Sequence, residues 1–109
     1  MADEKKIKRT RCYYTDYVNH MIRFFLSTPD RLDMKDKRKA DLDNWLAVQA
    51  VWYKLPDESK QVLKTIFGLH HRVSEGVRMY CEQTGADEYK TWVFITKTCA
   101  AIAKRRGLV

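Results

Sequence analysis

The chain has 109 residues, a length that favours a single domain, and 45% of them are hydrophobic, which is enough for a modest core. Its 4 glycines and 2 prolines are few for a protein with many β-turns. The net charge is +7, with lysines and arginines clustered along the chain. Such a balance favours polyanionic partners, with nucleic acid first and an acidic membrane surface second.

The sequence also gives little support for a membrane protein, a secreted protein or a zinc site. No stretch approaches the roughly 18 apolar residues of a membrane span, and no apolar run with a cleavage site follows the basic N-terminus. We therefore expect a cytoplasmic protein without a membrane partner. The cysteines at positions Cys12, Cys81 and Cys99 form no CxxC or CxxH motif, so they are interpreted as thiols in a reducing compartment rather than zinc ligands.

The N-terminal half is predicted to be a basic arm followed by two helices. Residues 1–11 carry five basic and two acidic side chains, and they have nothing to bury. Residues 12–28 and 38–55 each place apolar side chains at helical spacing and are joined by a polar connector. Trp45 and Trp52 share one stripe of the second helix, which indicates either the main core or a dimer seam.

Three more helices are predicted after residue 55. Pro56 followed by acidic residues is typical of a helix start, and Gly68 is well placed as the C-terminal stop of that helix. Ser74 is predicted to cap the next helix, which Gly85 ends. Asp87 is predicted to cap the last helix through its carboxylate. The fold class is therefore all-α, a bundle of about five helices formed by a single domain over residues 12–109.

The last helix, which runs to residue 106, has two different faces. One face is apolar and is predicted to pack in the core. It consists of residues at helical spacing, namely Trp92, Ile95, Cys99 and Ile102. The other face is cationic and consists of residues seven positions apart, namely Lys90, Lys97 and Lys104. The second face is the candidate functional surface.

Residues 73–106 have the pattern of a helix-turn-helix, in which the second helix enters the major groove of DNA. That geometry asks for a small residue where the helices cross and a glycine about four residues later, and Cys81 and Gly85 satisfy both. The side chains predicted to face bases or phosphates are Lys90, Thr91, Phe94, Lys97, Lys104, Arg105 and Arg106.

Two features of the same helix oppose DNA binding. Asp87 and Glu88 put negative charge at the end that would approach the duplex. Phe94 projects beside the lysines rather than from the apolar face, which indicates that another element covers it. An amphipathic helix of a bundle without nucleic-acid function would show the same pattern.

Catalysis has little support. The sequence contains no GxSxG, HExxH or phosphate-binding glycine loop. His70 and His71 are adjacent and cannot both face one metal from a helix, and His20 lies far from them in sequence. We therefore expect neither enzymatic activity nor a catalytic residue, metal site or cofactor.

Residues 55–68 resemble the segment that opens the fourth conserved region of bacterial sigma factors. Leu55-Pro56 is followed by acidic residues, and the segment ends in the aromatic–glycine pair Phe67-Gly68. Small phage-encoded transcription activators resemble that region too. The turn departs from the family pattern, because Ala86-Asp87 follows Gly85 where an aliphatic–serine pair is usual. The resemblance implies a helix-turn-helix after residue 68, duplex DNA and RNA polymerase as partners, and no enzymatic activity.

Two functions remain open on the sequence. The first is a DNA-binding transcriptional regulator of phage or prophage origin. The alternative is a non-enzymatic helical module whose aromatic first two helices form a homodimer or bind a partner protein. The Lys90–Lys97–Lys104 side of the last helix distinguishes them, because only the first function requires these lysines to be exposed together.

Overall fold

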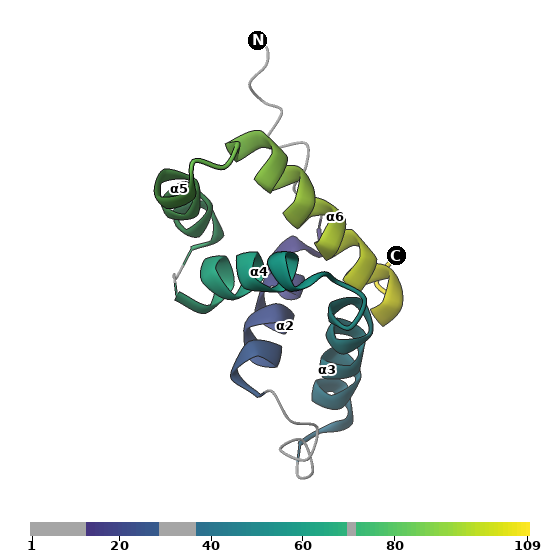
Figure 1. Cartoon of the computed structure of the whole chain (residues 1–109). Helices are drawn as coiled ribbons and strands as arrows, with labels where there is room; N and C mark the ends of the chain where they lie inside the picture. Colours follow the sequence, from purple (N-terminus) through teal and green to yellow (C-terminus); the bar gives the residue numbers. More distant parts are fainter. Residues whose placement is uncertain (1–12, 29–36, 70–71) are drawn as a thin grey trace.

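The computed structural model describes residues 13–28, 37–69 and 72–109, and the regular secondary structure of these residues is entirely helical. The helices are α2 (Thr15–Ser27), α3 (Lys39–Trp52), α4 (Asp57–Leu69), α5 (Val73–Thr84) and α6 (Glu88–Arg106) (Figure 1). The all-α prediction is therefore confirmed. Several predictions fall outside the described residues, namely those for the arm 1–11, most of the connector 29–37, Cys12, His70 and His71.

The core lies around α2, which contacts α3, α4 and α6. Its buried face is formed by Val18, Met21, Ile22 and Phe25. α6 runs along one side of the molecule, from α5 at one end to α3 at the other (Figure 1). Among the helices that the structure describes, none covers the long outer side of α6, where Lys90, Lys97 and Lys104 are exposed.

Trp45 of α3 is the largest fully buried side chain, with an exposed fraction of 1%. Its ring centroid lies 5.3 Å from that of Phe25, and its indole N–H donates to the carbonyl oxygen of Thr28 at 2.5 Å. Of the two tryptophans predicted to form a core or a dimer seam, Trp45 therefore belongs to the core of a single chain. Trp52 is half-buried beside the same phenylalanine, at 5.5 Å.

α5 packs against α4 at a glycine. A Cβ atom at Gly76 would lie 2.6 Å from the carbonyl oxygen of Ile66, closer than any side chain tolerates. The close approach explains a glycine inside a helix, where it costs about 1 kcal/mol relative to alanine. Gly76 therefore sets the distance between the backbones of the two helices.

Two predicted helix boundaries are wrong. Gly68 does not end α4, which continues to Leu69, because Gly68 keeps a negative φ instead of the left-handed conformation of a helix stop. Ser74 does not cap α5, which begins at Val73 with Arg72 at the N-cap position and no side-chain cap. Gly85 does end α5 as predicted, in the left-handed conformation with φ of 78°.

None of the helices over the described ranges is both long enough and apolar enough to cross a membrane.

Gly76→Ala is expected to lower the free energy of unfolding by roughly 1–3 kcal/mol, because the added methyl group clashes with backbone that cannot move freely. Gly68→Ala is the matched control, since a Cβ there meets nothing within 4 Å. It should raise stability by about 0.5–1 kcal/mol through helix propensity. Urea unfolding followed by circular dichroism measures both, and equal effects of the two variants would contradict the close-approach explanation.

Candidate nucleic-acid interface

The connection between α5 and α6 is a tight glycine turn. The Gly85 N–H donates to the carbonyl oxygen of Cys81 at 2.8 Å, which closes the end of α5. Asp87 then caps α6 as predicted, because its carboxylate accepts the backbone N–H of Lys90 at 3.0 Å. The chain thus changes direction within a few residues, as a helix-turn-helix requires.

Cys81 and Thr91 mark the point where α5 and α6 cross. The Cys81 Sγ lies 3.6 Å from the Thr91 Oγ1, so a small residue stands where the motif asks for one. Thr91 is only 7% exposed, and its hydroxyl donates to the carbonyl oxygen of Asp87 at 2.9 Å. The expectation that Thr91 faces DNA is therefore wrong, because this side chain holds the two helices together.

The inner face of α6 largely agrees with the sequence pattern. Ile95, Cys99 and Ile102 are buried as predicted, whereas Trp92 is only half-buried at the edge of that face. Phe94 is also half-buried and packs against the core, so the expectation that it is exposed among the lysines is wrong. This burial agrees with the other interpretation of Phe94, in which its position beside the lysines indicates that another element covers it.

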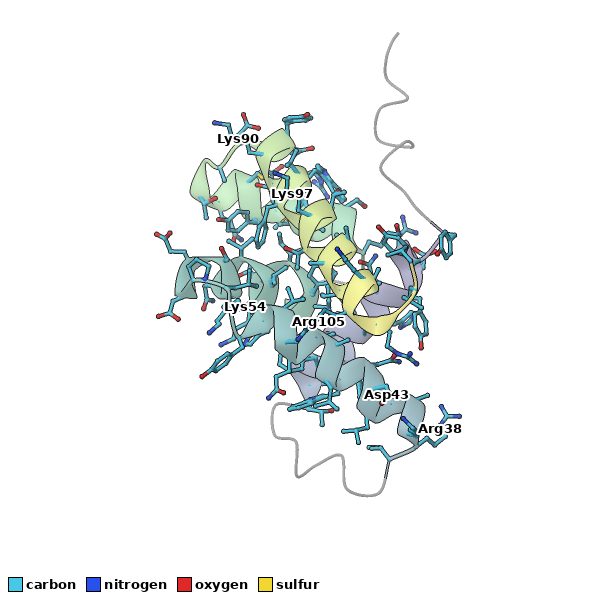
Figure 2. All side chains as sticks on the ribbon, turned by 90° about the vertical axis from the view of Figure 1, so that its right-hand side faces the viewer. Arg38, Asp43, Lys54, Lys90, Lys97 and Arg105 are labelled. Carbon is cyan, nitrogen blue, oxygen red and sulfur yellow. The ribbon has the colours of Figure 1, made fainter. Side chains whose placement is uncertain are left out.

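The outer face of α6 carries a row of exposed lysines, Lys90, Lys97 and Lys104. Seven residues correspond to about 10.5 Å of helix, so the row extends over about 21 Å. Arg105 is exposed beside this row, and Lys54 reaches the same side from the end of α3 (Figure 2). We call these five cations (Lys54, Lys90, Lys97, Lys104 and Arg105) the cationic face.

The cations of the cationic face form no ion pairs with described residues. The sequence contains no acidic residue after Glu88. Among the side chains that the structure describes, none forms an ion pair with Lys54 or with the four cations of α6. Unpaired ammonium groups concentrated on one surface produce the positive potential that attracts phosphates.

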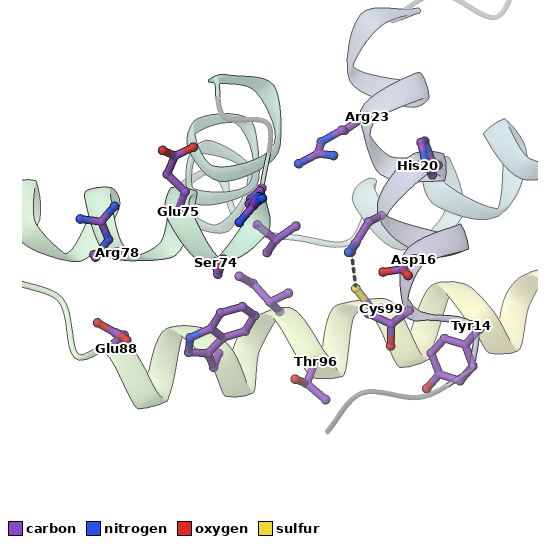
Figure 3. Close-up of a pocket in the computed structure, with 16 residues that line it drawn as sticks. Tyr14, Asp16, His20, Arg23, Ser74, Glu75, Arg78, Glu88, Thr96 and Cys99 are labelled. Carbon is purple, nitrogen blue, oxygen red and sulfur yellow. Dashed lines mark hydrogen bonds between the residues drawn. The ribbon is translucent and has the colours of Figure 1, made fainter. Parts of the chain in front are cut away.

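The two acidic residues at the start of α6 do not lie in the row of lysines. The Asp87 carboxylate is used as the cap, where it lies against the positive end of the helix dipole. Glu88 lines a pocket on the inner side of α6 (Figure 3). In helical projection, Glu88 lies about half a turn from Lys97, so the two charges face in opposite directions.

Arg106 belongs to the fold rather than to the cationic face. Its Nε donates to the Asn44 Oδ1 at 2.6 Å, and the Asn44 Nδ2 donates to the Tyr17 hydroxyl at 2.8 Å. This Arg106–Asn44–Tyr17 network joins α6, α3 and α2. Arg106, which is predicted to face bases or phosphates, is therefore only partly exposed and already bonded to Asn44.

Lys54 is the residue that sequence reasoning missed. It follows α3 and has no place in the periodic pattern of α6, so only the packing of α3 along α6 brings it to the cationic face. No local feature of the sequence could have identified it. The structure thus extends the candidate interface beyond a single helix.

A pocket of about 1120 Å³ lies on the opposite side of α6, between α2 and α5 (Figure 3). Its charged lining mixes both signs and comprises Asp16, Arg23, Arg72, Glu75, Arg78 and Glu88. Its floor includes Cys99, whose thiol lies 3.8 Å from the Asn19 Oδ1. Across the described residues, no three His, Cys, Asp or Glu side chains are grouped closely enough to hold a metal ion.

Comparison with known proteins identifies no relative: no protein-family model, no curated protein and no solved structure matches the chain. The resemblance to the fourth region of sigma factors, over about residues 55–106, stays a prediction.

Cys99 is expected to resist alkylation in the folded protein. Burial raises the pKa of its thiol from 9.0 to about 12, so below pH 9 it carries roughly a thousandfold less thiolate than an unperturbed thiol. Iodoacetamide labelling at pH 8, followed by peptide mass spectrometry, should modify the half-buried Cys81 first. Labelling in urea should remove the difference, and equal rates without urea would contradict the burial of Cys99.

Arg106→Ala is expected to lower the free energy of unfolding by about 1 kcal/mol, because it removes the hydrogen bond to Asn44. The neighbouring Arg105→Ala removes the same charge from an exposed side chain and should change stability by less than about 0.5 kcal/mol. Thermal or urea unfolding of the two variants distinguishes an arginine that stabilises the fold from one that is only exposed. A destabilisation by Arg105→Ala as large as that by Arg106→Ala would argue against the network.

Proposed function

We propose that this chain is a DNA-binding transcriptional regulator that contacts duplex DNA through its cationic face. The observation that carries the proposal is the exposure of Lys90, Lys97 and Lys104 in one row, without an acidic residue between them. Duplex DNA presents a phosphate every 3.4 Å along each strand, so a row about 21 Å long spans roughly six base-pair steps. Each lysine that neutralises a phosphate releases a counterion, which drives binding.

The helix–turn–helix geometry of α5 and α6 supports the same function. The glycine turn, the Asp87 cap and the Cys81–Thr91 contact hold α6 at a defined angle to α5. The resemblance of residues 55–68 to sigma factors is consistent with this arrangement. It adds RNA polymerase as a proposed second partner, a phage or prophage origin and a cytoplasmic location.

The composition of the cationic face favours phosphate contacts over base reading. Bidentate recognition of adenine uses Asn or Gln, and α6 contains neither. Its exposed guanidinium is at Arg105, near the C-terminal end rather than in the first turns. We therefore propose that affinity depends weakly on base sequence.

The alternative, a homodimer or partner interface formed by the aromatic residues of the first two helices, has less support. Phe25 and Trp45, two aromatic residues of these helices, are buried in the chain's own core. These two side chains are therefore packed inside the chain and are not available for contact with a second protein.

Lys90→Gln, Lys97→Gln and Lys104→Gln are each expected to weaken binding to a fluorescein-labelled duplex in an anisotropy titration. With five phosphate contacts, the logarithm of the affinity should fall with the logarithm of the salt concentration at a slope of about −4.5, and each variant should reduce that slope by about 0.9.

Arg78→Gln is the matched control for these variants. It removes one positive charge, but Arg78 lies on α5 beside the pocket and pairs with Glu82 at 3.9 Å. It should leave the salt slope nearly unchanged. If all four variants had equal effects, binding would follow net charge alone, and unchanged affinity in the three lysine variants would refute the assigned surface.

A further inference from the structure

Two highly exposed tyrosines, Tyr53 and Tyr89, are sequence neighbours of lysines of the cationic face. Tyr53 is 81% exposed and Tyr89 is 73% exposed. The other exposed tyrosines of the described chain have hydrogen-bond partners, since the Tyr13 hydroxyl donates to the Leu108 carbonyl and the Tyr17 hydroxyl accepts from Asn44. Neither Tyr53 nor Tyr89 forms a side-chain hydrogen bond or ring contact with any described residue. Their rings contribute little to the fold.

Each of these tyrosines directly precedes a lysine of the cationic face. Tyr53 stands before Lys54 at the end of α3, and Tyr89 stands before Lys90 in the first turn of α6. Both lysines are on the same side of the molecule (Figure 2). This pairing in the sequence, an exposed tyrosine followed by a lysine of the cationic face, therefore occurs twice, at the end of α3 and at the start of α6.

This pairing matches the chemistry of an unpaired nucleotide. An aromatic ring stacks on the flat face of a base, while a neighbouring cation neutralises the phosphate. A base inside a closed duplex already stacks on its neighbours and offers no free face to a ring. Stacking also tolerates any base, which agrees with the absence of Asn and Gln from α6.

We infer that the cationic face binds locally unpaired DNA more tightly than closed duplex, with Tyr53 and Tyr89 stacking on exposed bases while the lysines hold the backbone. This inference rests on the proposed DNA-binding function and names the form of DNA that the surface prefers. Tyr53 follows the last residue of α3 and Tyr89 lies in the first turn of α6, and these two helices pack together. The surface therefore offers a stacking platform at two separate positions.

The test compares two labelled probes of equal length and charge, a fully paired duplex and the same duplex with a central bubble of unpaired thymines. The full-length protein should bind the bubble roughly 5- to 150-fold more tightly for each base that stacks. Tyr53→Ala and Tyr89→Ala should reduce this preference and leave affinity for the paired probe unchanged. Tyr53→Phe and Tyr89→Phe should retain the preference, because the ring remains. Circular dichroism checks that each variant is folded.

The possible results separate this inference from the proposed function. Equal affinity for the two probes, with lysine-dependent binding to both, would overturn the inference and leave duplex binding intact. A preference for the bubble that survives both alanine variants would overturn the role of the tyrosines. Binding to neither probe would refute the proposed function itself.

Discussion

The arrangement of the helices depends on the packing of Trp45 against α2. Burying an indole leaves its N–H without water, and this cost is avoided only if a protein acceptor replaces the lost hydrogen bond. The Thr28 carbonyl, just beyond the end of α2, provides that acceptor, while Phe25 packs on the ring. One side chain thus fixes where α2 ends and where α3 lies. Since α6 packs along both helices, the position of the cationic face follows from the same contact.

Helical periodicity predicted the elements well because it records which side of each helix is apolar. The five helices and the buried residues Ile95, Cys99 and Ile102 follow from spacing alone. Helix ends were predicted where one residue type has a clear local role, as for the Asp87 cap and the Gly85 stop. Prediction failed at residues 68 and 74, where glycine and serine have several permitted roles and tertiary packing selects among them.

The candidate site was only partly accessible to sequence reasoning. The row of lysines on α6 follows from periodicity, but the flanks of the row depend on which helices lie beside it. Thr91 and Phe94 are covered by such neighbours, and Arg106 is held by Asn44 from a distant part of the chain. Lys54 joins the surface for the same reason. Each of these outcomes is set by contacts between helices, which a pattern within one helix does not contain.

The anchoring of α6 at both ends has a consequence for the entropy of binding. The Asp87 cap holds the first turn of α6, and the Arg106–Asn44–Tyr17 network holds the last. The lysines between them are therefore mounted on a backbone whose conformation is already restricted before a partner arrives. Ordering a flexible helix on binding would cost about 1–2 kcal/mol for each residue. On α6 the loss is confined to the rotamers of the lysine side chains, so most of the electrostatic attraction remains available as affinity.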